Sequence, residues 1–355
     1  MSSSVPEAIG KVPMPERSPN VILGKQDFMS VLLRSIGGEL YKIRRRPLAK
    51  ALLLIGIAIM ILGFGVFALP AIINSSLPVE SYLPPPCKGS ASSIQSQCLN
   101  HTPNAEDLAK AAQVKTLEVK AASTPLYLPD SFFTAISIIY FIGVMLIIIL
   151  AGTIVGGEYI SGSIRVMLTR GPTRTQFLLA KVGTMLIYSA FLLVLLAFVG
   201  ILTGAILTLL TNASVDWKFL TSAWLLHCLL FLLLAILGLF VYGTLAICFS
   251  TLGKATVGGV AGGLIWWFME RVLSSILPFL GLSNKSAFGN FLSAVPDYFI
   301  GNNIGALLNN QEQYMNGGQA TGSISDLHAI IVLLVYLAVF IGSAWWVNQA
   351  RDISN

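Results

Sequence analysis

The sequence predicts an all-α polytopic membrane protein with six transmembrane helices. Composition is the first observation behind this prediction, because 55% of the 355 residues are hydrophobic and only 11% are charged, and the mean hydropathy is +0.78. A soluble domain would carry about a quarter charged residues. The other two observations are six long apolar runs and the distribution of basic residues between them.

Each apolar run is long enough to cross a bilayer, which takes about 20 residues in a helix. The runs cover residues 51–73, 131–157, about 175–210, about 219–250, about 255–280 and 327–348. Because six is an even number of crossings, both termini are expected on the same side of the membrane.

The charges between the runs predict which side that is. Fifteen Lys or Arg and 6 Asp or Glu fall in segments 1–50, 157–181, 250–256 and 347–355, whereas the other side holds 7 basic and 10 acidic residues. Basic residues concentrate on the cytoplasmic side, so we expect both termini inside, in the plasma (cytoplasmic) membrane. The net charge of +6 therefore reflects membrane orientation rather than binding to nucleic acid. Residues 1–26 lack the apolar core of a cleavable signal peptide.

Residues 1–50 are predicted to form a cytoplasmic tail followed by an amphipathic elbow helix, and residues 51–355 the transmembrane domain. Asp27 is suited to cap the start of this helix. The apolar positions that follow recur at helical spacing: Phe28, Val31, Leu32, Ile36, Leu40 and Ile43. Since its charged residues lie on other faces, this helix is expected to lie in the headgroup layer.

The largest polar segment, residues 74–130, is predicted to be an extracellular loop. It contains Cys87 and Cys98, and a disulfide between them is favoured over two free thiols because this side of the membrane is oxidising. Residues 103–120 have the composition of a helix. Such a helix would either shape the exit of a transport path or pack over the outer mouth, and the sequence favours neither.

A shorter polar stretch, Gly152 to Lys181, separates the second and third apolar runs. Within it Ile160, Ile164 and Met167 or Leu168 recur at helical spacing, which predicts a short amphipathic helix at the membrane surface. Gly171 and Pro172 then end this helix, because proline cannot continue it and disfavours a helical conformation in the residue before.

This stretch resembles the cytoplasmic loop of ABC-2 type transporter permeases, the membrane subunits of one class of ABC exporters. The residues that carry the resemblance are Glu158, Gly162, Arg165, Leu168, Arg170, Pro172, Arg174, Phe177, Leu178, Leu179 and Lys181. Positive charge alone would suit any cytoplasmic loop, but it does not explain the ordered spacing of Glu, Gly, Arg and Pro. In that family the loop carries a coupling helix, which docks on a separate ATP-binding subunit. The resemblance thus implies an ATPase-coupling site comprising Glu158, Ile160, Gly162, Ile164, Arg165, Met167, Leu168, Arg170 and Arg174.

The resemblance also implies the partners of the chain. A permease of this type pairs with a second copy or a related chain, exports a substrate whose class the sequence does not indicate, and has its power supplied by an ABC ATPase subunit. ATP and Mg would be bound by that partner, with no cofactor and no catalysis in this chain. In agreement, no glycine pair is followed by the Lys-Ser/Thr of a phosphate loop. The elbow helix would flank the ATPase contact, although an ordinary juxtamembrane helix would show the same pattern.

The charged residues Glu270 and Arg271 interrupt the fifth apolar run. Charge inside a membrane is costly and is often functional, but counting from Gly253 at ~1.5 Å per residue, Glu270 would lie about 25 Å along the helix, near the outer face. An interfacial structural role is therefore favoured over substrate contact. The resemblance further implies re-entrant helices between the fifth and sixth spans, for which Val272 to Leu282 and Ala287 to Leu308 could provide the two arms.

Small residues are spaced for close helix packing in the third and fifth runs. They are Gly200 and Gly204, the pair Gly258-Gly259, and the pair Gly262-Gly263. Packing in the bilayer is the usual meaning of this spacing, and it is favoured here over a dimer or gating seam.

Two other classes of protein are alternatives to a permease. An ATP-independent secondary transporter would show inverted repeats or ionisable residues at the membrane midplane, and neither is evident. An intramembrane enzyme would need a catalytic group of residues inside the spans, and neither His227 nor Glu270 has an evident partner for that chemistry.

Overall fold

The computed structural model describes residues 27–85, 102–127, 130–164, 167, 172–210, 220–283, 286–320 and 322–350; the side chains of 208–210 and 282–283 are not described. Within these residues the chain forms α-helices and short 3-10 segments, and no strand. The predicted disulfide between Cys87 and Cys98 lies outside the described residues, as do Arg165, Leu168 and Arg170 of the predicted coupling site.

Six of the helices are long and apolar enough to cross a membrane, which confirms that part of the prediction. Their bounds are α2 (Pro47–Ser76), α4 (Asp130–Ile160), α6 (Arg174–Leu210), α7 (Ser222–Gly253), α8 (Thr256–Ser283) and α11 (Asp326–Ala350). Each of the six predicted runs corresponds to one of these helices. The fold is that of a multi-pass membrane protein.

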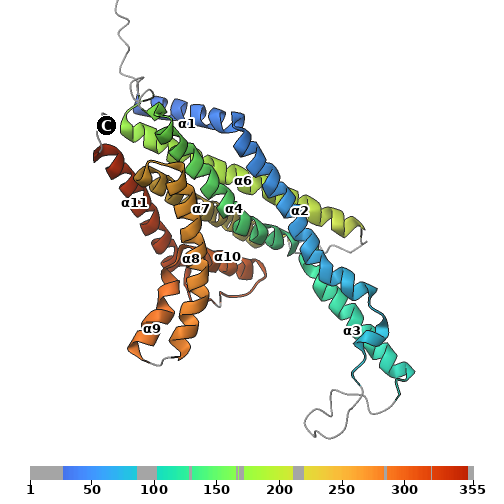
Figure 1. The fold of residues 1–355 in the computed structure, drawn as a ribbon. Coiled ribbons are helices and arrows are strands. Elements are labelled where there is room, and N and C mark those ends of the chain that lie inside the picture. Colours follow the sequence, from blue (N-terminus) through green and yellow to red (C-terminus); the bar gives the residue numbers. More distant parts are fainter. Residues whose placement is uncertain are drawn as a thin grey trace, which may run out of the picture.

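The remaining helices are shorter, and most of them lie toward the two ends of this bundle (Figure 1). They are α1 (Phe28–Arg45), α3 (Ala105–Ser123), α9 (Ala287–Ala294) and α10 (Ile300–Met315), with 3-10 segments at Val79–Tyr82, Thr124–Leu126 and Val295–Tyr298. We call the end that carries α1 the α1 end and the opposite one the far end. The last turn of α11 also lies at the α1 end (Figure 1).

Helix α4 is the centre of the bundle. The most apolar window of α4 is 78% buried inside the protein, against 17% to 33% for the other five spanning helices. Helices α7, α8, α6 and α2 pack around it. The other five therefore keep most of their apolar surface on the outside of the bundle, as lipid-facing helices do.

Glycines allow α4 and α8 to cross with their backbones in contact. A Cβ atom added to Gly152 would lie 2.8 Å from the backbone nitrogen of Val260, and one added to Gly156 would collide with the backbone of Thr256. The Ser250 hydroxyl donates to the Gly152 carbonyl at 3.1 Å and joins α7 to the same crossing. Small residues thus serve close packing in this part of the bundle, as small-residue spacing does in membranes.

Helix α1 lies across the α1 end and meets α2 at an angle (Figure 1). The corner is made by Arg46, which has an extended backbone, and by Pro47, which occupies the first turn of α2, where its missing N–H costs nothing. Helix α1 packs mainly on α6. Its buried residues are Val31, Glu39 and Ile43, so an acidic side chain lies inside what was expected to be an apolar face.

At the far end α3 lies beside the last turns of α2 and extends beyond the bundle (Figure 1). Its start has a capping box in which Asn104 and Asp107 each accept from the other's backbone N–H, an arrangement that satisfies two otherwise unpaired donors. The helix expected at 103–120 is therefore present.

The segment between the fifth and sixth spans differs in detail from the expected pair of arms. Helix α8 continues through Pro278 to Ser283, so Val272 to Leu282 belongs to the fifth span and is not a separate helix. Proline is tolerated inside transmembrane helices because neighbouring groups satisfy the freed carbonyl. The chain then turns back, and α9 packs against α8 before α10 runs between α7 and α11.

Candidate functional site

Four charged side chains meet at the α1 end, where α1, α4 and α6 come together. We call them the charge network: Glu39 and Lys42 from α1, Glu158 from the last turn of α4, and Lys181 from α6. The Lys181 ammonium lies 2.5 Å from Glu39 and 2.6 Å from Glu158. The Lys42 ammonium lies 2.6 Å from Glu39 and 3.3 Å from Glu158. Each lysine therefore bridges both carboxylates.

Three of these four residues are buried. The exposed fraction is 1% for Lys181, 3% for Glu158 and 6% for Glu39. Buried charges are stable only when they are paired, and two ammonium groups with two carboxylates give a network with no net charge. The network consequently ties three helices together that are far apart in the sequence.

Electrostatics within the network keep Glu39 ionised. Burial by itself would raise the pKa of the Glu39 carboxyl, but attraction by Lys181 and Lys42 and the hydrogen bonds from both ammonium groups outweigh it, so the pKa lies below its usual value of 4.5. Glu39 is therefore a carboxylate at any pH near neutral.

The predicted coupling segment begins directly beside this network. Helix α4 ends at Ile160, and Gly162 adopts a left-handed backbone with φ +66°, which favours glycine. Ile160 is 67% exposed, whereas Ile164 is 8% exposed. The break at Gly162 means that the two isoleucines do not lie on one continuous helix, as the spacing had predicted.

The segment is connected to the network through Met167. The Lys42 ammonium lies 3.7 Å from the Met167 sulfur. Of the predicted coupling residues, Glu158 and Met167 both contact Lys42, while the side chain of Ile160 is exposed.

Arg174 lies at the other end of the segment, where it contacts α11. Its guanidinium donates to the carbonyls of Asn348 and Gln349 at 3.2 and 3.0 Å, in the last turn of α11. The Asn348 amide donates in return to the Arg174 carbonyl at 3.0 Å. A cation at this position satisfies carbonyls that have no partner within their own helix, so Arg174 joins the first turn of α6 to the last helix.

The start of α6 is fixed by a second capping arrangement. Thr173 and Gln176 each accept from the other's backbone N–H, at 3.2 and 2.9 Å. The Gln176 amide also donates to the carbonyl of Phe28, the first residue of α1, at 3.3 Å. The segment between α4 and α6 is therefore held on both sides by polar contacts with other helices.

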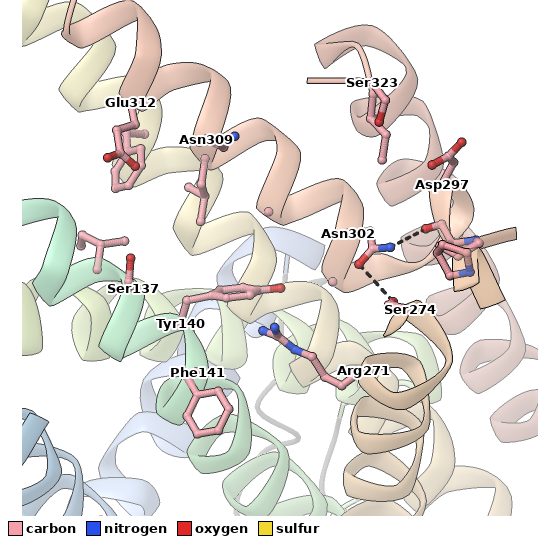
Figure 2. Close-up of a pocket in the computed structure, with 18 of the residues that line it drawn as sticks. Ser137, Tyr140, Phe141, Arg271, Ser274, Asp297, Asn302, Asn309, Glu312 and Ser323 are labelled. Carbon is pink, nitrogen blue, oxygen red and sulfur yellow. Dashed lines mark hydrogen bonds between the residues drawn. The ribbon is translucent and has the colours of Figure 1, made fainter. Parts of the chain in front are cut away.

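A second site lies toward the far end, where α4, α8 and α10 surround a cavity of about 840 Å³. Its described polar lining comprises Ser137, Tyr140, Arg271, Ser274, Ser293, Asp297, Asn302, Asn309, Glu312 and Ser323. Figure 2 shows Tyr140 from α4 and Arg271 from α8 pointing toward one another. The Asn302 amide side chain accepts from Ser274 at 3.1 Å and donates to the Pro296 carbonyl at 2.9 Å, so it links α8 to α10.

Glu270 and Arg271 have different surroundings, although they are adjacent in the sequence. Glu270 is 6% exposed, accepts from the Tyr242 hydroxyl at 2.7 Å, and faces the backbone N–H groups of Ile300 and Gly301 at the start of α10. A helix start favours a negative charge. Arg271 instead lies over the Trp267 ring at 5.9 Å and lines the cavity.

Residues missed by sequence reasoning carry most of the charge network. The sequence pattern places the charged residues of the amphipathic helix, which include Glu39 and Lys42, away from its apolar face, and Lys181 is part of the prediction only through the family resemblance. The spacing of Glu39 and Lys42 by three residues does place them on one helix face. Among the described residues, no group of three or more His, Cys, Asp or Glu is placed to hold a metal ion.

Six apolar helices in one bundle, with an amphipathic helix across one end, define the class as multi-pass membrane proteins. The sequence pattern of the family described as "Protein of unknown function (DUF2705)" matches residues 122–354, and the chain belongs to that family. This match includes Glu158, Lys181 and the cavity, whereas Glu39 and Lys42 precede it. No curated protein and no solved structure matches the chain.

Proposed function

We propose that the chain is the permease subunit of an ATP-binding cassette exporter of the ABC-2 type, driven by a separate ATPase subunit that binds ATP and Mg. The observation that carries this proposal is the charge network of Glu39, Lys42, Glu158 and Lys181. It joins the amphipathic helix to both helices that flank the predicted coupling segment. Ion pairs between these three helices would allow a movement of the coupling segment to reach the membrane-spanning bundle.

In the proposed mechanism, these contacts carry movement from the coupling segment to the bundle. Closure of two ATPase subunits would displace the segment 158–174. The ion pairs of Glu158 and Lys181 transmit this displacement to α4, α6 and α1 together, and Arg174 extends it to α11. Because α4 lies at the centre of the bundle, its movement repacks the helices around it and switches access across the membrane.

The cavity beside Arg271 is where we place contact with the exported molecule. Arg271 lies fifteen residues along α8 from Thr256, which is ~22 Å from the α1 end. A charged residue inside a membrane-spanning helix is costly unless it serves a cavity or pathway. In this proposal Glu270 holds α8 to α10, and Arg271 is the residue that contacts cargo. The proposal thus gives the two residues different roles, whereas the sequence favoured an interfacial structural role for the pair.

The orientation in the proposal has the α1 end in the cytoplasm of the cell and the 74–130 loop outside, in the plasma membrane, with the permease acting as a dimer of this chain or of two related chains. It rests on the distribution of basic residues. Labelling of engineered cysteines from the exterior should reach Ser92 and miss Ser3.

The test is the association of the full-length chain with a Walker-motif ATPase. The tagged chain, purified from its native membrane in mild detergent, should retain such a subunit in a fixed ratio, with ATP hydrolysis that is lost when the ATPase is removed. Arg165→Glu and Ile160→Asp should reduce both association and hydrolysis. Ile160 is a better position for this test than Ile164, because Ile160 is exposed and Ile164 is already buried within this chain.

Lys254→Glu is the control, since Lys254 lies in the tight turn between α7 and α8, which is a different polar segment of the chain from 158–174. It should leave association unchanged. A chain that transports without any ATPase, driven by an ion gradient, would instead be a secondary transporter, the alternative that the sequence left open.

A further inference from the structure

An apolar groove with a basic rim lies at the α1 end, between α1, α2 and α6. Its volume is about 360 Å³. Ile43 from α1, Leu53 from α2, and Ile187 and Phe191 from α6 form its apolar walls, while Arg44 and Lys50 lie at its edge. This groove is separate from both sites described above.

The walls of the groove differ in how they are covered. Ile43 is 4% exposed and forms the floor, whereas Ile187 and Phe191 are 44% and 51% exposed on the outer face of α6. Since α6 is one of the spanning helices, these exposed side chains face the hydrocarbon of a bilayer. The groove is therefore open toward the lipid and closed toward the protein.

The rim of the groove is positively charged. Arg44 and Lys50 are exposed and lie on either side of the corner between α1 and α2, at the level where an amphipathic helix meets a spanning one. Neither forms an ion pair with an acidic side chain in the part of the chain that the structure describes. Their charges are thus available to an anion at the membrane surface.

We infer that this groove binds one anionic phospholipid, with its phosphate between Arg44 and Lys50 and one acyl chain along Leu53, Ile187 and Phe191. The combination of a basic rim and an apolar groove at the end of a span has the polarity of such a lipid from headgroup to chain. Basic pockets between transmembrane helices bind anionic headgroups in this manner. The inference rests only on insertion in a membrane and does not depend on the transport proposal.

Bound lipid would act on the charge network, because the two share α1. Lys42 lies between the groove residues Ile43 and Arg44 on one side and Glu39 on the other, within the last two turns of α1. A lipid that holds this end of α1 against α2 and α6 would also stabilise the ion pairs of the charge network. We therefore expect a bound anionic lipid to stabilise the α1 end of the protein.

The experiment measures lipid binding to the purified full-length chain in detergent by native mass spectrometry and by the shift in melting temperature. The probes are dioleoyl phosphatidylglycerol, dioleoyl phosphatidylcholine and glycerol phosphate. Phosphatidylglycerol should remain bound as one molecule and raise the melting temperature, while phosphatidylcholine and glycerol phosphate should do neither. Equal retention of the two lipids would overturn the inference, as would an equal effect of glycerol phosphate.

The variant Arg44→Gln with Lys50→Gln should weaken phosphatidylglycerol binding about fivefold for each charge removed. The control is Arg45→Gln with Arg46→Gln, which removes the same charge from the same corner without touching the groove. If both double variants weaken binding equally, the lipid is attracted only to a basic surface and the groove is not its site. Ile187→Asp, on the exposed wall, should also weaken binding, and normal binding by this variant would contradict the position of the acyl chain.

Discussion

The Lys181 ammonium on α6 lies 2.5 Å from the Glu39 carboxylate on α1, and 142 residues separate the two in the sequence. Lys181 is 1% exposed, so this ion pair lies inside the protein and not on its surface. Glu158 contacts the same ammonium at 2.6 Å. The pair therefore marks the point at which the amphipathic helix is fixed to the membrane-spanning bundle.

Lys181→Met should strongly destabilise the protein. The substitution removes the central cation and leaves Glu39 and Glu158 buried beside each other with Lys42 alone to neutralise them. Removal of one partner of a buried ion pair commonly costs about 3–5 kcal/mol. Thermal unfolding of the purified chain in detergent should show a large fall in melting temperature.

Two further variants separate the network from a general effect of lysine removal. Lys181→Met combined with Glu39→Gln should recover part of the lost stability, because one uncompensated carboxylate is gone. Lys110→Met removes a lysine that pairs with Glu106 on the exposed surface of α3 and should leave the melting temperature unchanged, since surface pairs contribute little. A Lys181 variant as stable as the Lys110 variant would show that the network does not hold α1.

The pKa of Glu39 predicts a loss of stability in acid. Since its pKa in the folded protein is lowered from 4.5, the unfolded chain takes up a proton first as the pH falls. The contribution of Glu39 to stability is therefore fully present above about pH 4.5 and is lost as the pH falls through the lowered value.

The measurement is melting temperature against pH for the wild type and for Glu39→Gln. The variant should be less stable at neutral pH, and the difference between the two should narrow below about pH 4.5. A difference that stays constant from pH 7 to pH 3.5 would mean that Glu39 is not held ionised by the lysines.

Gly156 and Gly157 give a matched test of the crossing between α4 and α8. A Cβ atom on Gly156 would collide with the backbone of Thr256, whereas one on Gly157 would have nothing within 4 Å. Gly156→Ala should therefore destabilise by about 1–3 kcal/mol, because a backbone cannot move aside as a side chain can. Gly157→Ala should be neutral or stabilise slightly, since alanine favours a helix. Equal stability of the two variants would contradict the close crossing.

Much of the fold could be predicted from the sequence because the bilayer sets the length of a spanning helix. All six runs were found for that reason, and the amphipathic pattern of α1 was found from its 3.6-residue period. The burial of Glu39 could not be predicted in the same way. Whether a charged side chain can be buried depends on partners from other elements, and the partners of Glu39 include Lys181 on α6.

Two local details could not be predicted from the spacing of residues. Ile160 and Ile164 have helical spacing, but the left-handed backbone of Gly162 lies between them and ends the helix that their spacing assumes. Glu270 and Arg271 are adjacent, and consecutive residues of a helix point about 100° apart. One of them can therefore pack inside the bundle while the other lines a cavity, which is a difference that their position in the sequence does not show.

The hydrogen bond from Tyr242 to Glu270 supports the last prediction, which concerns the join between α7, α8 and α10. The Tyr242 hydroxyl is buried and donates to Glu270 at 2.7 Å. Tyr242→Phe removes this donor and leaves the carboxylate oxygen in an apolar interior, which costs about 1–3 kcal/mol. Tyr336→Phe is the control, because its hydroxyl donates to the Tyr298 carbonyl at an exposed position and not in the interior of the protein. The melting temperature should fall for the first variant and stay nearly constant for the second. If Tyr242→Phe has the same melting temperature as the wild type, the backbone N–H groups at the start of α10 are sufficient hydrogen-bond partners for Glu270. The carboxylate would then not hold α7 to α8.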